Sequence, residues 1–180
     1  TASLEGFTAS KPFVGTLRTQ GFHSAADPMV HQYNFNIQYQ LTESLLLETS
    51  YSGLLGRDLS SMFINVNQLP FSAALQGLNT QANRPFPNIN GTVIPVFSNG
   101  TNDYNSVNFR VDKRYANGFA LLVNYTIQKN IEARGSGPDS YTQNGTSIAM
   151  DTYNLAREKS VAPIDVPQIF SASGGYTFPL

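Results

Sequence analysis

The sequence predicts an all-β fold in which antiparallel strands cross a membrane as one segment of a β-barrel. Three observations support this: several stretches alternate apolar and polar residues, tight turns alternate with long polar connections, and charged residues are scarce. Of the 180 residues, 13% are charged, about half of the roughly 25% found in a typical soluble domain. We expect about five strands in an up-and-down meander with long outer loops. Five strands are too few to close a barrel with a lumen, so we expect an open sheet.

The clearest alternation lies at residues 30–41. Successive side chains of a strand point to opposite faces of the sheet. Apolar residues occupy the odd positions, and amides occupy the even ones: Tyr33, Phe35, Ile37, Tyr39 and Leu41 against Gln32, Asn34, Asn36, Gln38 and Gln40. One face is therefore rich in tyrosine, and the other is polar but nearly uncharged. This composition is typical of a barrel strand, which has apolar residues on its lipid-facing side and polar residues on its lumen-facing side.

Four further stretches show the same pattern, at residues 45–55, 104–115, 119–129 and 168–178. A turn at Thr42–Ser44 joins the first two strands. Asn117–Gly118 joins the third and fourth strands, because both residues tolerate a positive φ. All ten prolines fall outside the five stretches, as expected because proline is excluded from central strands. We interpret residues 1–180 as one partial barrel domain with long loops at 56–103 and 130–167.

The turns and the long loops fall on opposite sides of the predicted sheet. In bacterial outer-membrane barrels the short turns face the periplasm and the long loops face outward. The sequence therefore places Thr42–Ser44 at the periplasmic rim, with Tyr33 and Tyr51 toward the outer one. Lys113 lies on the apolar side next to a turn, from which a lysine reaches the lipid headgroups.

Catalysis and cofactor chemistry find little support in the residues. His23 and His31 are the only histidines, they have no partners at metal-ligand spacing, and cysteine is absent. We therefore predict no enzyme activity, no catalytic residue, no metal site and no cofactor. The net charge of −1 and the lack of a basic cluster argue against a nucleic-acid partner, because binding phosphates requires a basic surface.

Several motifs resemble the TonB-dependent outer-membrane receptors, in particular the Oar-like group with a carboxypeptidase-regulatory-like N-terminal domain. They occur in the same order as in that group: DPMVHQYNFNIQYQLTESLLLETSYSGLLGRDL at 27–59, NVNQLP at 65–70, RPFP at 84–87, YNSVNFRVDKRYANGFALLVNYTIQKNI at 104–131 and DVPQIFSASGGYTFPL at 165–180. The resemblance implies an internal part of a barrel of about 22 strands in the bacterial outer membrane. It also implies energised uptake of a large or scarce substrate.

The same resemblance implies the partners. These are outer-membrane lipid, the rest of the barrel, a plug domain, and a TonB complex that acts through regions absent from this sequence. Four charged residues are predicted on the polar, lumen-facing side of the strands: Glu48, Arg110, Asp112 and Arg114. They either contact cargo or the plug, or pair with one another across neighbouring strands. The second interpretation is favoured, because such pairs are common in wet barrels.

Two other interpretations stay open at this point. The first is a secreted, soluble β-sandwich that binds carbohydrate, with the tyrosines as stacking platforms and the apolar faces packed into a core. The second is a surface adhesin or autotransporter with a complete barrel of its own.

Overall fold

The computed structural model describes residues 6–19, 26–61, 64–95, 97–133 and 149–178. The chain divides into two compact units. The first, called the sheet unit below, comprises Val30–Gly56, Asn102–Ile131 and Val161–Leu180. The second, called the loop unit, comprises Thr1–Met29, Arg57–Thr101 and Glu132–Ser160.

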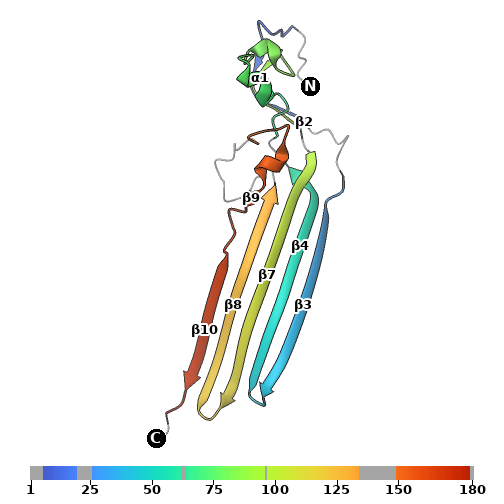
Figure 1. Cartoon of the computed structure of the whole chain (residues 1–180). Coiled ribbons are helices and arrows are strands. Elements are labelled where there is room, and N and C mark those ends of the chain that lie inside the picture. The colour runs from blue at the N-terminus through green and yellow to red at the C-terminus, as the bar shows by residue number, and fades with distance from the viewer. Residues whose placement is uncertain (1–5, 20–25, 62–63, 96, 134–148, 179–180) are drawn as a thin grey trace. The chain divides into compact units, whose positions relative to one another are not determined.

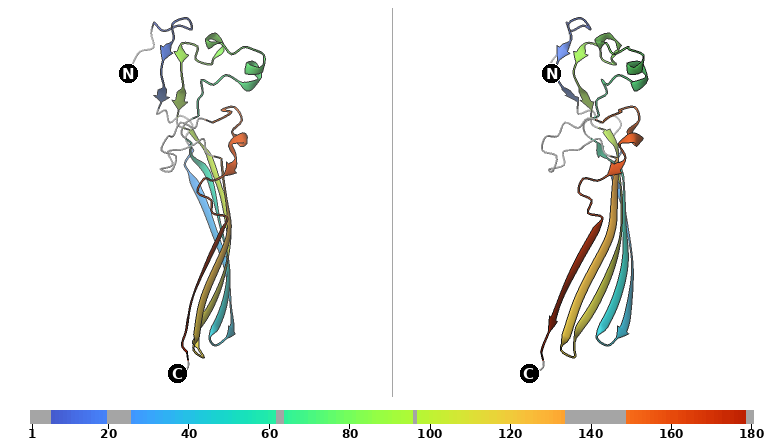
Figure 2. Two further views of the ribbon diagram at one scale, coloured as in Figure 1. Left: turned by 90° about the vertical axis from the view of Figure 1, so that its left-hand side faces the viewer. Right: turned by 60° about the vertical axis from the view of Figure 1, so that its left-hand side comes forward.

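Five long strands form the main sheet. They are β3 (Met29–Thr42), β4 (Leu45–Ser61), β7 (Phe97–Ala116), β8 (Phe119–Ala133) and β10 (Gln168–Tyr176), and they lie in the order β10-β8-β7-β4-β3 (Figure 1). The short strand β9 (Ser160–Val161) also pairs with β8. Figure 2 shows that the long strands form a single twisted layer with two separate edges. The predicted open antiparallel meander is confirmed.

The pairing of β10 with β8 preserves the alternation along both strands. Phe170 lies opposite Tyr125 and Tyr176 lies opposite Phe119, whereas Ser171 lies opposite Asn124. Residues opposite one another in a sheet share a face. Aromatic residues therefore gather on one side of this pair of strands and small polar residues on the other.

The turn between β7 and β8 follows the prediction. Asn117 and Gly118 have φ values of 54° and 80°, so both central residues are left-handed, as a type I′ turn requires. This turn matches the twist of the flanking strands and holds them antiparallel. At the same end of the sheet, Glu43 and Ser44 separate β3 from β4.

The strands differ in length from the predicted ranges. β4 continues to Ser61, β7 begins at Phe97, and β8 continues to Ala133, whereas β10 ends at Tyr176. The expectation of a long loop at 56–103 is therefore wrong at both of its ends. Within it lie α1 (Phe71–Leu75), η1 (Gln81–Asn83), β5 (Ile89–Asn90) and β6 (Val93–Pro95), and residues 130–167 contain η2 (Leu155–Glu158) besides β9.

The loop unit has a small core of its own. Strand β1 (Phe13–Val14) pairs in parallel with β5, and β2 (Leu17–Thr19) pairs in parallel with β6. Among the described residues of this unit, the buried apolar side chains are Ile64, Ile89, Val93, Ile94 and Ala149. Two amides are buried with them, Asn65 and Asn67.

The apolar side of the long sheet is not covered by a second layer in the described residues. Every residue of β3 and of β10 is exposed. The exposed fraction is 62% for Phe35 and 63% for Tyr39. A β-sandwich would bury this face between its two sheets, so the sandwich alternative is wrong. None of the helices in the described ranges is long and apolar enough to cross a membrane.

Candidate functional site: the two faces of the sheet

The polar face is held by hydrogen bonds between side chains of even-numbered residues. The Nδ2 of Asn36 and the Nε2 of Gln38 both donate to the carboxylate of Glu48, at 2.6 and 3.2 Å. On the next pair of strands, Asn108 Nδ2 donates to Thr126 Oγ1 at 2.8 Å. Tyr104 Oη likewise donates to Gln128 Oε1 at 2.8 Å. In this part of the face the network consists of amides and hydroxyls around the carboxylate of Glu48.

Arg110 and Asp112 form an ion pair on this face, with 2.9 Å between Arg110 Nη2 and Asp112 Oδ2. They are two residues apart on β7, so their side chains lie on the same side of that strand. The Nε of Arg110 is buried and has no partner among the described residues. One donor of this guanidinium therefore has no acceptor in the described part of the chain.

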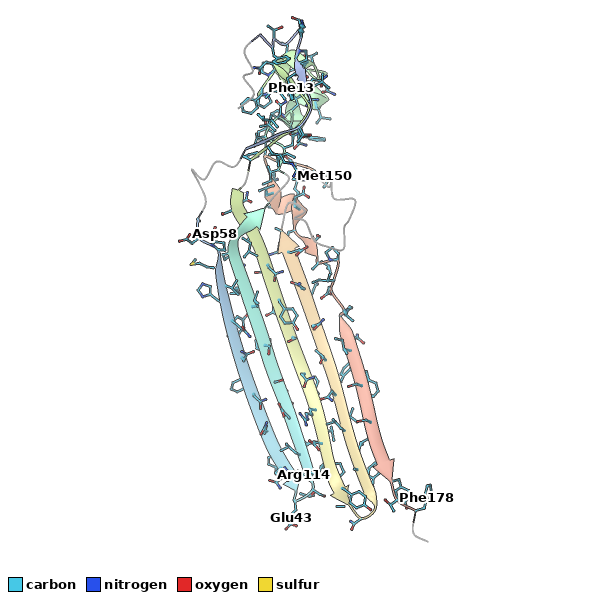
Figure 3. All side chains as sticks on the ribbon, turned by 180° about the vertical axis from the view of Figure 1, so that it is seen from behind. Phe13, Glu43, Asp58, Arg114, Met150 and Phe178 are labelled. Atoms are coloured by element: carbon cyan, nitrogen blue, oxygen red, sulfur yellow. The ribbon has the colours of Figure 1, made fainter. Side chains whose placement is uncertain are left out.

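Arg114 lies at the end of the sheet where the short turns are. Its backbone N–H donates to the carbonyl oxygen of Ser44 at 2.8 Å, which links β7 to the turn between β3 and β4. Its side chain is exposed and borders a small recess with Gln40 and Glu43. Figure 3 shows Arg114 and Glu43 at this end of the sheet.

The four charged residues predicted on the polar face are thus not brought together into one cluster. Glu48 is bound by amides of β3, and Arg110 and Asp112 pair along a single strand. The sequence favours pairing across neighbouring strands. Among the described contacts of these four residues, Arg110 pairs with Asp112 on the same strand, and Glu48 accepts from amides of β3.

The opposite face contains a cluster that the sequence analysis missed. Tyr33 on β3 and Tyr51 on β4 have ring centroids 5.9 Å apart. Both hydroxyls donate to Asn105 Oδ1 on β7, at 3.4 Å from Tyr33 and 2.6 Å from Tyr51. The signal was present in the sequence, since Asn105 is a polar residue in the odd series that continues with Val107 and Phe109.

Lys113 is the next polar residue in that odd series, and its ammonium donates to Ser44 Oγ. Between Asn105 and Lys113, the odd positions of β7 are Val107, Phe109 and Val111. Eight residues of strand correspond to about 26 Å. A strand tilt of about 40° reduces this to a height of about 20 Å, comparable to the apolar band of about 25 Å on outer-membrane barrels. Asn105 and Lys113 therefore mark the two borders of the apolar band on β7.

The loop unit is organised by the NVNQLP motif. The fully buried Asn67 donates from Nδ2 to the carbonyl oxygens of Ile89 and Gly91, at 2.8 and 3.2 Å. Its Oδ1 accepts the backbone N–H of Phe86 at 2.8 Å. Asn65 Oδ1 accepts the N–H of Val93 at 3.0 Å.

Gln68, from the same motif, binds a second segment of the loop unit. Its Nε2 donates to the carbonyl oxygen of Met150 at 2.7 Å, and its Oε1 accepts the N–H of Thr152 at 2.9 Å. The hydroxyl of Tyr153 donates to the carbonyl oxygen of Gln68 at 2.8 Å. The motif therefore connects the segments of the loop unit to one another through hydrogen bonds. In the described part of the chain, no three His, Cys, Asp or Glu side chains gather as a metal site requires.

An open antiparallel sheet with one apolar and one polar face defines the class of protein: it is the wall of a membrane-spanning β-barrel. The family model described as "Outer membrane beta barrel domain" matches residues 2–180. The chain belongs to this family, and its place is the bacterial outer membrane. No curated protein and no solved structure matches the chain.

Proposed function

We propose that this chain supplies wall strands to a TonB-dependent outer-membrane receptor that takes up a large or scarce substrate with energy from the inner membrane. The observation that carries the proposal is the pair of open edges formed by β3 and β10. A sheet of five long strands with two open edges is one arc of a larger barrel. Barrels of about 22 strands enclose a plugged lumen, whereas those of 16–18 strands leave an open aqueous channel.

The motif order described above supports the receptor over a porin. NVNQLP and RPFP belong to the resemblance with Oar-like receptors, and in this chain they fold together: Asn67 of the first accepts the N–H of Phe86 in the second. A receptor of this kind captures its cargo outside the membrane. An ordered loop unit with its own buried core suits that task better than a loose connection does.

The two faces of the sheet have separate roles in this proposal. The apolar face anchors the wall in lipid. The polar face, with Glu48, Arg110, Asp112 and Arg114, faces the lumen, where the exposed part of the Arg110 guanidinium is a donor for the plug or the cargo. The chain performs no catalysis and binds no cofactor or nucleic acid, and the TonB complex acts through other regions of the receptor.

The test is capture by TonB. Outer membranes that contain the full-length protein are solubilised in detergent and passed over the immobilised periplasmic domain of TonB from the same bacterium. We expect the protein to be enriched, while a porin from the same extract passes through. Recovery of the folded protein in the flow-through together with the porin would contradict the proposal. A deletion of the gene and an inactivation of TonB should also cause growth defects on the same nutrient.

A further inference from the structure

An open hollow of about 620 Å³ lies beside the short turns of the sheet unit. The polar residues that line it are Thr42, Glu43, Ser44, Lys113 and Asn117. They come from both short turns and from the end of β7, so the meander itself brings them together. Leu45 adds an apolar wall on the β4 side.

The donors in this hollow suit a phosphate group. The ammonium of Lys113 is held against Ser44 Oγ, which fixes its position and leaves two of its three N–H donors unused by that bond. Thr42 and Ser44 add hydroxyls, and Asn117 adds an amide. Ammonium, hydroxyl and amide N–H groups are the usual donors to phosphate oxygens.

The same hollow also contains one carboxylate, that of Glu43. Glu43 is exposed and makes no ion pair with a cation among the described residues. The lining of the hollow contains one lysine and one glutamate, and Arg114 borders the adjoining recess with Glu43. An anionic headgroup would meet repulsion from Glu43, whereas a zwitterionic headgroup would find a partner for each of its charges.

The position of the hollow points to a lipid and not to a free anion. Lys113 follows directly on the apolar series Val107, Phe109 and Val111 of β7. Its ammonium therefore lies at the border of the apolar band, where a lipid phosphate lies when its acyl chains cover that band. Leu45, in the hollow itself, continues the apolar surface toward those chains.

We propose that this hollow binds the headgroup of a glycerophospholipid that carries both a phosphate and a primary ammonium. Lys113, with the hydroxyls of Thr42 and Ser44, binds the phosphate, and Glu43 binds the ammonium. The proposal rests on the outward orientation of the apolar face and is independent of uptake through TonB. Its failure and the failure of the receptor proposal are therefore separate results.

The experiment is native mass spectrometry of the full-length protein. The delipidated protein receives an equimolar mixture of phosphatidylethanolamine and phosphatidylglycerol, and the lipids retained at rising collision energy are counted. The wild type should retain phosphatidylethanolamine preferentially. Lys113→Gln should lower its retention about tenfold, the loss expected for a hydrogen bond to a charged group. Glu43→Gln should abolish the preference for phosphatidylethanolamine while the phosphate is still bound.

Two controls separate this site from general lipid contact. Lys129→Gln removes an exposed lysine from the apolar series of β8 and should leave retention unchanged, whereas Lys113→Arg should preserve it. Migration of unheated protein in a denaturing gel checks that each variant has folded. Equal retention by the wild type and Lys113→Gln would overturn the proposal. So would an equal loss in Lys129→Gln, or displacement of the lipid by millimolar inorganic phosphate.

Discussion

The ring of Tyr33 on β3 lies across Gly53 on β4, in the space that a side chain at position 53 would occupy. A methyl group added at Gly53 would overlap the Cε2 and Cζ atoms of the tyrosine ring. Glycine weakens a strand because it adds no side chain to pack. Here the neighbouring aromatic ring covers the backbone of Gly53, which is buried, and compensates for part of that loss.

Gly53→Ala should destabilise the barrel by about 1–3 kcal/mol, the usual effect of inserting a methyl group into a filled space. Tyr33→Ala removes the ring and should remove most of the penalty for the added methyl. Equilibrium unfolding of the full-length protein in lipid vesicles, for both single variants and the double variant, measures this coupling. Purely additive effects would show that the two residues do not touch.

Tyr51→Phe should destabilise the protein more than Tyr33→Phe. Both changes delete a hydroxyl that donates to Asn105 Oδ1, but the Tyr51 bond is 2.6 Å long and the Tyr33 bond is 3.4 Å. We expect a loss of about 1 kcal/mol for Tyr51→Phe and a smaller one for Tyr33→Phe. In an Asn105→Ala background, which has no amide acceptor, the two phenylalanine variants should become equivalent. The same unfolding assay checks this order.

Phe109→Arg should impair folding strongly, whereas Asn108→Arg should have little effect. The two residues are adjacent on β7, and Phe109 lies midway between the borders at Asn105 and Lys113. An arginine on the lipid face near the bilayer centre costs about 2–4 kcal/mol, but the lumen face is wet. The yield of folded protein in isolated outer membranes measures the difference. Equal yields would mean that the odd-numbered face does not meet lipid.

Asn67→Ala should loosen the loop unit without unfolding the sheet. It removes the partner of the Phe86 N–H and of two carbonyl groups at a fully buried position. Each buried group left unpaired costs about 1–3 kcal/mol. Hydrogen exchange should become faster at Phe86, while the amides of β8 keep their protection. Asn83→Ala is the matched control, because it removes a single exposed bond, to the carbonyl oxygen of Leu78.

The sheet could be predicted because its signals are local. The alternation along β3 and β8 can be recognised from residues that are close in the sequence. The left-handed turn at Asn117–Gly118 follows from those two residue types. The extensions of β4 and β7 carry no such signal. Apolar and polar residues do not alternate there, as Arg57, Asp58 and Gly100 show. These parts of the strands pair through backbone hydrogen bonds, which do not depend on the type of side chain.

The loop unit and the Tyr33–Tyr51–Asn105 cluster depend on contacts between distant parts of the sequence. The amide of Asn67 is buried because Phe86, Ile89 and Gly91 fold around it. Nothing next to Asn67 in the sequence distinguishes it from an exposed loop asparagine. Asn105 similarly acquires its role from tyrosines 54 and 72 residues earlier in the chain. Such a residue is recognised only once the order of the strands is known.

The open edges of β3 and β10 have a consequence for how this protein enters its membrane. Each edge presents a row of peptide groups with no strand beside it in the described residues. Each peptide group left unbonded in hydrocarbon costs several kilocalories per mole. Insertion ahead of neighbouring strands would add that penalty at every position along both edges. Entry into the bilayer and closure of the ring must therefore be coupled in time, so that strand pairing keeps pace with the loss of water.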